Sequence, residues 1–134
     1  MPVARPPRLL IVDDEESIPK LVDRVLTEAG YDNAMVGDAS AALDVAAHSE
    51  PFNLLIADLM MLGTRGDELA RQLRQRTPDL KVLYLTGFAD RLFEARPVLW
   101  EDEAFLEKPF SKTGLLEAVS LALFGHTRGP RAVE

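Results

Sequence analysis

Three short stretches of this 134-residue chain are apolar at every position, and this feature limits the fold most. They are residues 9–12 (Leu-Leu-Ile-Val), 54–57 (Leu-Leu-Ile-Ala) and 82–85 (Val-Leu-Tyr-Leu), and a fourth strand-like run follows at residues 104–107. A strand that is apolar on both faces must be covered on both faces, which is typical of a parallel sheet. Strand-like and helix-like segments alternate five times. The sequence therefore predicts an α/β fold with a doubly wound, five-stranded parallel sheet.

A polar residue comes directly after each of the four runs. The residues are Asp13 with Asp14, then Asp58, Thr86 and Lys108. The carboxyl ends of parallel strands converge on the crevice where such folds bind ligands. Three carboxylates, a hydroxyl and an ammonium in one crevice predict a site for a divalent cation and a phosphoryl group.

The clustered carboxylates define the chemistry of this site. Two unit charges 4 Å apart repel by about 4 kcal/mol at an effective dielectric constant near 20, so a cation or a proton must neutralise part of the charge. Oxygen donors without histidine or cysteine favour Mg²⁺. Asp58 is then the candidate nucleophile, since a carboxylate can form an aspartyl phosphate. Lys108 and the cation would share the phosphoryl charge, and Thr86 would donate a hydrogen bond to a phosphoryl oxygen.

Each of these residues also has a purely structural reading. The acidic pair at residues 13 and 14 could cap a helix, because acids favour helix N-termini. Asp58 and Thr86 could be turn residues, and Lys108 alone is uninformative. Compatible chemistry at four separate strand ends favours the shared site.

Caps and apolar spacing predict the helices and the remaining strand. Ser17 is expected to cap a helix that stops at Gly30. The residues expected on its inner face are Ile18, Leu21, Val22, Val25, Leu26 and Ala29. Residues 31–36 read as a strand at or near an edge of the sheet.

Two further helices follow with clear signals. Asp38 is a natural cap for residues 39–47, whose alanine-rich face suits close packing. Residues 67–76 form a helix with Leu69 and Leu73 turned inward. Arg71, Arg74 and Arg76 could form a local basic patch, but we expect them to form a solvated face of this helix.

The stretch between residues 86 and 104 is less regular. Pro97 should break a fourth helix, and a loop should follow that carries Trp100, Glu101, Asp102 and Glu103. Residues 98–100 are apolar and suit either a partner or homodimer contact or a contact with the core. The last helix is capped by Ser111, ends at Gly125, and has an inner face of Leu115, Ala118, Val119, Ala122 and Leu123.

Composition narrows the class of protein. The chain lacks cysteine, which excludes disulfides and thiolate metal sites. No stretch approaches the roughly 18 apolar residues of a membrane span, so a cytoplasmic protein is expected. The net charge of −7 argues against direct nucleic-acid binding. We expect a lead-in at residues 1–7, one domain at residues 8–125 and a tail at residues 126–134.

Four segments carry a family resemblance. They are LIVDDE at residues 10–15, IADLM at 56–60, LTG at 85–87 and FLEKPF at 105–110. They resemble the motifs of receiver domains of two-component response regulators, over residues 8–124. The resemblance implies a flavodoxin-like receiver fold with strand order 2-1-3-4-5.

The resemblance also implies roles for single residues. Asp58 would accept a phosphoryl group from a phosphohistidine of a sensor histidine kinase or a phosphotransfer protein. Thr86 and Phe105 would reorient on phosphorylation. The implied Mg²⁺ ligands are Asp14, Asp58 and the backbone carbonyl of Met60, with Asp13 acting through water.

The implied function is a switch. Phosphorylation would alter a surface that an unidentified downstream protein reads, and the chain would catalyse its own phosphorylation and dephosphorylation. Three alternatives stay open: a phosphotransfer intermediate or phosphate sink, a phosphorylation-independent docking module, and a receiver excised from a hybrid histidine kinase. Two positions depart from the common motif: Leu62 replaces a proline, and Gly87 replaces an alanine.

We predict slow self-dephosphorylation. Met60 and Phe88, two residues beyond Asp58 and Thr86, are apolar and cannot position an attacking water as polar side chains can. The decay of labelled phosphoprotein measures the rate, and a half-life of seconds would contradict the prediction.

Overall fold

The computed structural model describes residues 6–13, 17–59, 65–86, 103–107 and 110–124. Within these ranges the elements are β1 (Arg8–Val12), α1 (Ser17–Glu28), β2 (Asp32–Val36), α2 (Ala39–Ala47), β3 (Leu54–Asp58), α3 (Gly66–Arg74), β4 (Lys81–Thr86), β5 (Glu103–Glu107) and α5 (Lys112–Phe124).

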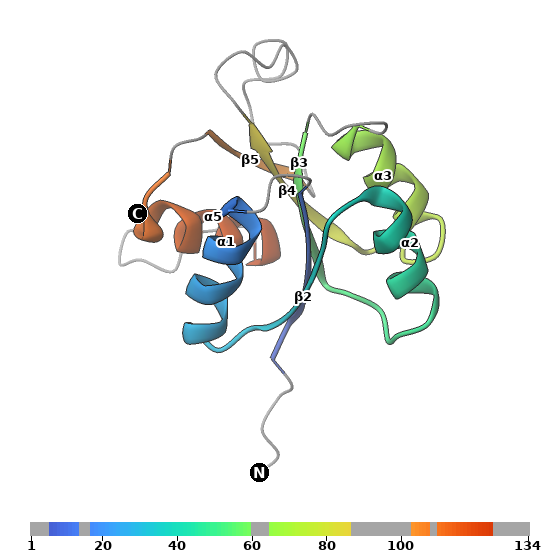
Figure 1. The fold of residues 1–134 in the computed structure, drawn as a ribbon, viewed down its shortest axis with the longest axis horizontal. Coiled ribbons are helices and arrows are strands. Elements are labelled where there is room, and N and C mark those ends of the chain that lie inside the picture. Colours follow the sequence, from blue (N-terminus) through green and yellow to red (C-terminus); the bar gives the residue numbers. More distant parts are fainter. Residues whose placement is uncertain (1–5, 14–16, 60–64, 87–102, 108–109, 125–134) are drawn as a thin grey trace.

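The five strands form one parallel sheet in the order β2-β1-β3-β4-β5. This order confirms the predicted topology, with β2 at an edge. Helices α1 and α5 cover one face and α2 and α3 cover the other (Figure 1). A parallel sheet built this way buries its central strands on both faces, which explains why they are apolar throughout.

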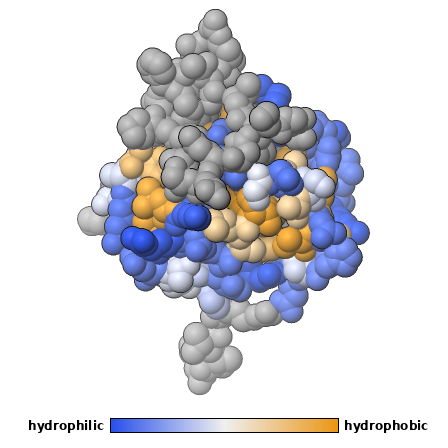
Figure 2. Space-filling model, in the orientation of Figure 1, coloured by the Kyte–Doolittle hydropathy of each residue, from blue (hydrophilic) through white to orange (hydrophobic). Residues whose placement is uncertain are grey.

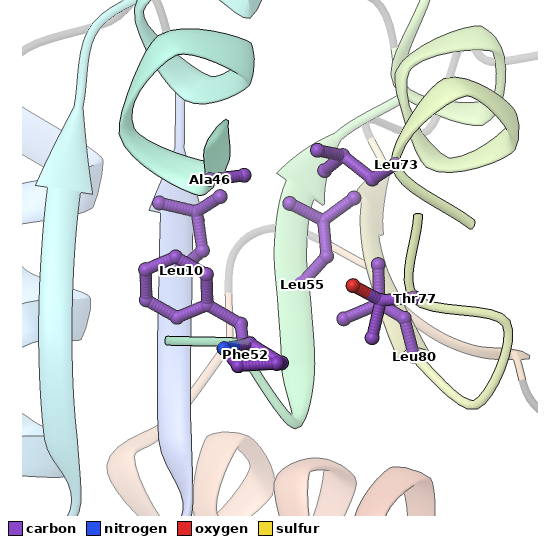
Figure 3. Close-up of a pocket in the computed structure, with 8 residues that line it drawn as sticks. Leu10, Ala46, Phe52, Leu55, Leu73, Thr77 and Leu80 are labelled. Atoms are coloured by element: carbon purple, nitrogen blue, oxygen red, sulfur yellow. The ribbon is translucent and has the colours of Figure 1, made fainter. Parts of the chain in front are cut away.

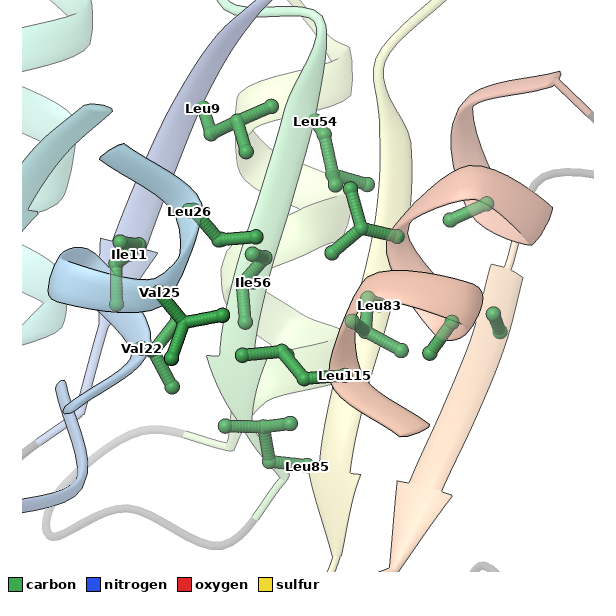
Figure 4. Packing of buried hydrophobic residues seen from close by; sticks show 14 residues of the cluster. Leu9, Ile11, Val22, Val25, Leu26, Leu54, Ile56, Leu83, Leu85 and Leu115 are labelled. Carbon is green, nitrogen blue, oxygen red and sulfur yellow. The ribbon is translucent and has the colours of Figure 1, made fainter. Parts of the chain in front are cut away.

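Side chains alternate between two hydrophobic cores along each strand. In β1, Leu9 and Ile11 point to the core under α1 and α5, whereas Leu10 and Val12 point to the core under α2 and α3. Figure 4 shows the first core, in which Val22, Val25 and Leu26 of α1 meet the strands, beside Leu115 of α5. The two cores together hold the sheet between its helix layers.

The second core ends in a small apolar opening near the amino ends of the strands (Figure 3). It has room for about one water molecule and is open in part to solvent. This opening lies at the opposite end of the strands from Asp58 and therefore plays no part in the predicted site. Its lining residues are Leu10, Ala46, Pro51, Phe52, Leu55, Leu73, Thr77 and Leu80.

Three predicted helix boundaries are confirmed by the cap geometry. The Asp38 side chain accepts a hydrogen bond from the Ala41 amide at 2.7 Å. The Ser111 hydroxyl accepts one from the Gly114 amide at 2.9 Å. After α1, Gly30 has a φ of 99°, a left-handed conformation that glycine adopts at little cost when it ends a helix.

The predicted inner face of α1 includes residues that are exposed in the structure. Leu21 is 47% exposed and Ala29 is also exposed, whereas Pro19 is buried. The helix packs over β1, β2 and α5, so only a narrow stripe of its surface faces the core. Ser17 is already helical, one residue earlier than expected. Figure 2 shows hydrophobic residues between hydrophilic ones across the face that carries α1, β2 and α2.

Two predictions about charged residues near the sheet are also wrong. Glu103 is the first residue of β5 rather than part of the preceding loop. Arg74 ends α3 with a side chain only 24% exposed, paired with Glu103, so it is not part of a solvated face. The reason is the ion pair itself, since each charge makes partial burial of the other tolerable.

Some expectations fall outside the described residues. These are the broken helix at Pro97, the loop at Trp100 and the tail after residue 125. Helix α3 covers Gly66–Arg74 instead of residues 67–76. In the ranges that the structure describes, no helix is long and apolar enough to cross a membrane.

Gly66 packs directly behind the end of β3. Its amide donates to the carbonyl of Leu59 at 2.8 Å. A Cβ atom at Gly66 would lie 2.5 Å from the carbonyl oxygen of Asp58 and 3.2 Å from the Cα of Leu59. Both are backbone atoms, so neither can move aside alone. The glycine is required here because the start of α3 touches the backbone of the predicted nucleophile.

We predict that Gly66→Ala destabilises the protein by roughly 1–3 kcal/mol, the range typical of overpacking. This would happen although alanine favours a helix over glycine by about 1 kcal/mol. Urea unfolding measures the change. Gly37→Ala is the matched control, because nothing lies within 4 Å of a Cβ atom there. Equal stability of the two variants would show that the close approach is not limiting.

Candidate functional site

The register of the sheet places Asp13 and Asp58 side by side. Val12 of β1 pairs with Ala57 of β3, so the next residue on each strand is an aspartate at the same level. Neighbouring strands lie about 4.8 Å apart. The sequence-based expectation that these two carboxylates meet at the carboxyl edge of the sheet therefore agrees with the backbone geometry.

Both aspartates are buried. Asp13 is 2% exposed and Asp58 is 8% exposed, and within the described residues the other buried side chains with a polar group are Ser120 and Tyr84. Buried charge is expensive unless it is compensated. Two neighbouring carboxylates also repel each other when both are ionised.

The backbone at the end of β3 is fixed from two sides. The Leu59 amide donates to the carbonyl of Leu85 on β4 at 3.0 Å, and the Leu59 carbonyl accepts from Gly66. Leu59 itself is fully buried. Asp58 consequently stands on a rigid segment, which suits a residue that must meet a reactant in one geometry.

The other predicted site residues are placed only in part. Thr86 is the last residue of β4, one position beyond Leu85, which pairs with Asp58. Its side chain lies outside what the structure describes. Asp14, Met60 and Lys108 also lie outside the described residues. Their convergence with Asp58 therefore stays a prediction.

The donors at this edge fit Mg²⁺ as far as they are described. Asp13 and Asp58 offer only carboxylate oxygens, the donors that this hard cation prefers. No group of three or more potential metal-binding side chains occurs among the described residues, and the third carboxylate of the predicted set, Asp14, is not among them. Two buried neighbouring carboxylates are what a divalent cation would stabilise.

Phe105, the predicted switch residue, lies on β5 directly opposite Tyr84 of β4. The two ring centroids are 5.2 Å apart with an interplanar angle of 33°. Phe105 is half-buried and packs against the core under α2 and α3.

Sequence reasoning missed a polar network beside this aromatic pair. The Tyr84 hydroxyl donates to Glu103 Oε2 at 3.3 Å, and Arg74 Nη1 donates to the same oxygen at 3.0 Å. Tyr84 lies within an apolar run of the sequence, so it was predicted to be a core residue with no polar role. Only its hydroxyl, which needs a partner when buried, signalled that a polar group must lie nearby.

The network perturbs the ionisation of Tyr84. Complete burial raises the pKa of its phenol far above the usual value, and the negative charge of Glu103 raises it further. The hydroxyl therefore stays protonated, and able to donate, throughout the physiological range.

The model of the response regulator receiver domain family matches residues 9–120 of the chain. Among curated proteins, the chain is 30% identical over 116 residues to the response regulator receiver protein CpdR of Brucella abortus, covering 87% of this chain and 96% of that one. It is 35% identical over 124 residues to the response regulator protein FleR of Pseudomonas aeruginosa, covering 91% of this chain but only 26% of the relative.

Solved structures show the same likeness. A response regulator receiver protein from Sinorhizobium medicae superposes with a TM-score of 0.76 at 26% identity, covering 88% of this chain and 94% of that one. The chemotaxis response regulator CheY4 of Vibrio cholerae gives a TM-score of 0.75 at 26% identity, covering 88% and 99%. The likeness extends over nearly the whole of these two structures.

We predict that the contribution of Tyr84 to the stability of the fold is lost at alkaline pH. Unfolded tyrosine ionises near pH 10, whereas buried Tyr84 stays protonated to higher pH. Its contribution is complete below about pH 10 and is lost as the pH rises from there through the folded pKa. The free-energy difference between wild type and Tyr84→Phe should fall by up to about 1.4 kcal/mol per pH unit in that window.

Urea unfolding between pH 9 and pH 11.5 tests this. Tyr31→Phe removes the chain's other tyrosine hydroxyl, which is only half-buried, and should retain the wild-type pH dependence. Parallel pH profiles for wild type and Tyr84→Phe would contradict the prediction.

Proposed function

Because this chain belongs to the response regulator receiver domain family, we propose that it is a phosphorylation-dependent switch with Asp58 as the phosphoacceptor. The observation that carries the proposal is the buried pair of Asp13 and Asp58 at the carboxyl edge of the sheet. A carboxylate in this position is shielded from bulk water yet stands where parallel sheets bind ligands.

In the proposed reaction, a carboxylate oxygen of Asp58 forms a bond to the phosphorus of a phosphohistidine on a sensor kinase or phosphotransfer protein. The phosphorus–nitrogen bond breaks, and its electron pair stays on the donor imidazole. That nitrogen takes a proton from solvent, so the donor leaves as neutral imidazole. The product is an acyl phosphate on Asp58.

The remaining residues of the proposed site would stabilise the negative charge of the phosphoryl group, directly or through Mg²⁺. Asp14, Asp58 and the carbonyl of Met60 would hold Mg²⁺, with Asp13 acting through water. When bound, this ion neutralises negative charge on the phosphoryl oxygens and the carboxylates. Lys108 would pair with one phosphoryl oxygen, and the Thr86 hydroxyl would donate to another.

The proposed output is a change in protein–protein contacts. Phosphorylation adds negative charge at the edge of the sheet, and Thr86 would follow the new phosphoryl oxygens. Phe105, on the neighbouring strand, would then change its position and alter the surface that a downstream protein reads. The free energy of this change is limited by how differently the two conformations interact with the phosphoryl group.

We predict Mg²⁺-dependent phosphorylation at Asp58. Wild type incubated with a small-molecule phosphoryl donor should gain one phosphoryl group by intact-mass measurement, and Asp58→Asn or removal of Mg²⁺ with a chelator should abolish the gain. Asp79→Asn is the matched control, since Asp79 is an exposed carboxylate just before the amino end of β4, and it should be labelled like wild type.

Labelling of Asp58→Asn at the wild-type level would refute the assignment of the acceptor. Absence of labelling in wild type with Mg²⁺ bound would instead require a protein donor. A purified phosphohistidine protein in place of the small molecule tests that case directly.

A further inference from the structure

A continuous set of side chains joins the end of α3 to β4 and to β5, the strand at one edge of the sheet. Arg74 Nε donates to the carbonyl of Leu80, which precedes β4, at 3.0 Å. Arg74 Nη1 and the Tyr84 hydroxyl both donate to Glu103 Oε2. One carboxylate on β5 therefore holds a helix residue and a β4 residue at once.

Burial makes this arrangement stronger than a surface ion pair. Tyr84 is fully buried, and the side chains of Arg74 and Glu103 are 24% and 15% exposed. Water screens such a pair less than an exposed one, and hydrogen bonds to a charged acceptor are the stronger kind. The Tyr84 ring is consequently fixed at both ends, by the backbone of β4 and by its hydroxyl.

Phe105 rests against this fixed ring. The two residues are direct neighbours across β4 and β5, and their rings are in contact distance at 5.2 Å between centroids. Phenylalanine has no polar group with which a hydrogen bond could set the ring position. Packing must decide it, and the Tyr84 ring is a rigid part of that packing.

We infer that Tyr84, held by Glu103 and Arg74, is a positioning residue that sets the side-chain conformation of Phe105. Its importance for switching rests on the proposed function. Any movement of Phe105 on phosphorylation must change its contact with Tyr84, so this contact contributes to the energy difference between the two switch conformations. The network thus gives the end of α3 an influence on the switch.

The first test reads the Phe105 side chain in the unphosphorylated protein. Three-bond NMR couplings from Phe105 Cγ to the backbone nitrogen and carbonyl carbon report its χ1 rotamer and are insensitive to ring currents. We expect one dominant rotamer in wild type and averaged couplings in Tyr84→Leu. Tyr84→Phe, which keeps the ring but loses the hydroxyl, should lie between them.

Two controls separate positioning from general loss of stability. Leu83→Val removes a methylene from the same strand, but in the opposite core, and should leave the Phe105 couplings unchanged. Glu103→Ala should average the couplings, and Glu103→Gln, which keeps an oxygen acceptor, should restore them in part. Wild-type couplings in both Tyr84 variants would overturn the inference.

The second test measures coupling to the phosphoryl site with beryllofluoride as a phosphoryl mimic. Tyr84→Leu should change the affinity for the mimic by roughly twofold to tenfold, the size expected of an aromatic pair. In the background of Phe105→Leu the same substitution should have little further effect. Leu83→Val should bind the mimic like wild type.

The outcomes distinguish the two proposals. If wild type does not bind the mimic but Phe105 loses its rotamer in Tyr84→Leu, the positioning role stands and the proposed function fails. If wild type binds the mimic and both Tyr84 variants match it in couplings and affinity, the positioning role fails and the proposed function stands.

Discussion

The whole structure depends on the need to cover both faces of the central strands. Between their polar end residues, strands β1, β3 and β4 are buried and hydrophobic at every position, so helices must lie on each side of the sheet. Parallel pairing follows, because α1, α2 and α3 connect β1 to β2, β2 to β3 and β3 to β4 across the faces of the sheet. All carboxyl ends then meet at one edge. The site is located by this constraint before any particular side chain is considered.

The carboxyl end of the sheet also carries the features that are hardest to accommodate in the folded chain. Asp13 and Asp58 are buried side by side, and the backbone of Asp58 leaves no room for a side chain at Gly66. Burying two carboxylates is costly unless their charge is compensated, and the close backbone approach restricts position 66 to glycine. Such features persist where function requires them. They are physical support for the proposed reactive site at this end of the sheet.

A second group of polar side chains lies between α3, β4 and β5. Arg74, Glu103 and Tyr84 form a partly buried network that reaches Phe105, the residue proposed to move. Its members come from α3, β4 and β5, and each had a simpler interpretation in the sequence. Arg74 belonged to an arginine-rich helix face, Glu103 to an acidic run, and Tyr84 to an apolar strand.

The sequence by itself determined the fold class, the strand positions and the N-terminal caps of α2 and α5. These follow from local rules: apolar runs, the spacing of buried residues, and the hydrogen bonds of Asp38 and Ser111. It also identified Asp13 and Asp58 as neighbours, since strand ends converge in any parallel sheet. Tertiary structure alone decided which charges pair and which apolar residues stay exposed. Leu21 faces outward because α1 covers only part of the sheet, and Arg74 turns to Glu103, 29 residues away. Pairings over such distances depend on how helices and strands are placed in space, and spacing along the chain carries no record of that placement.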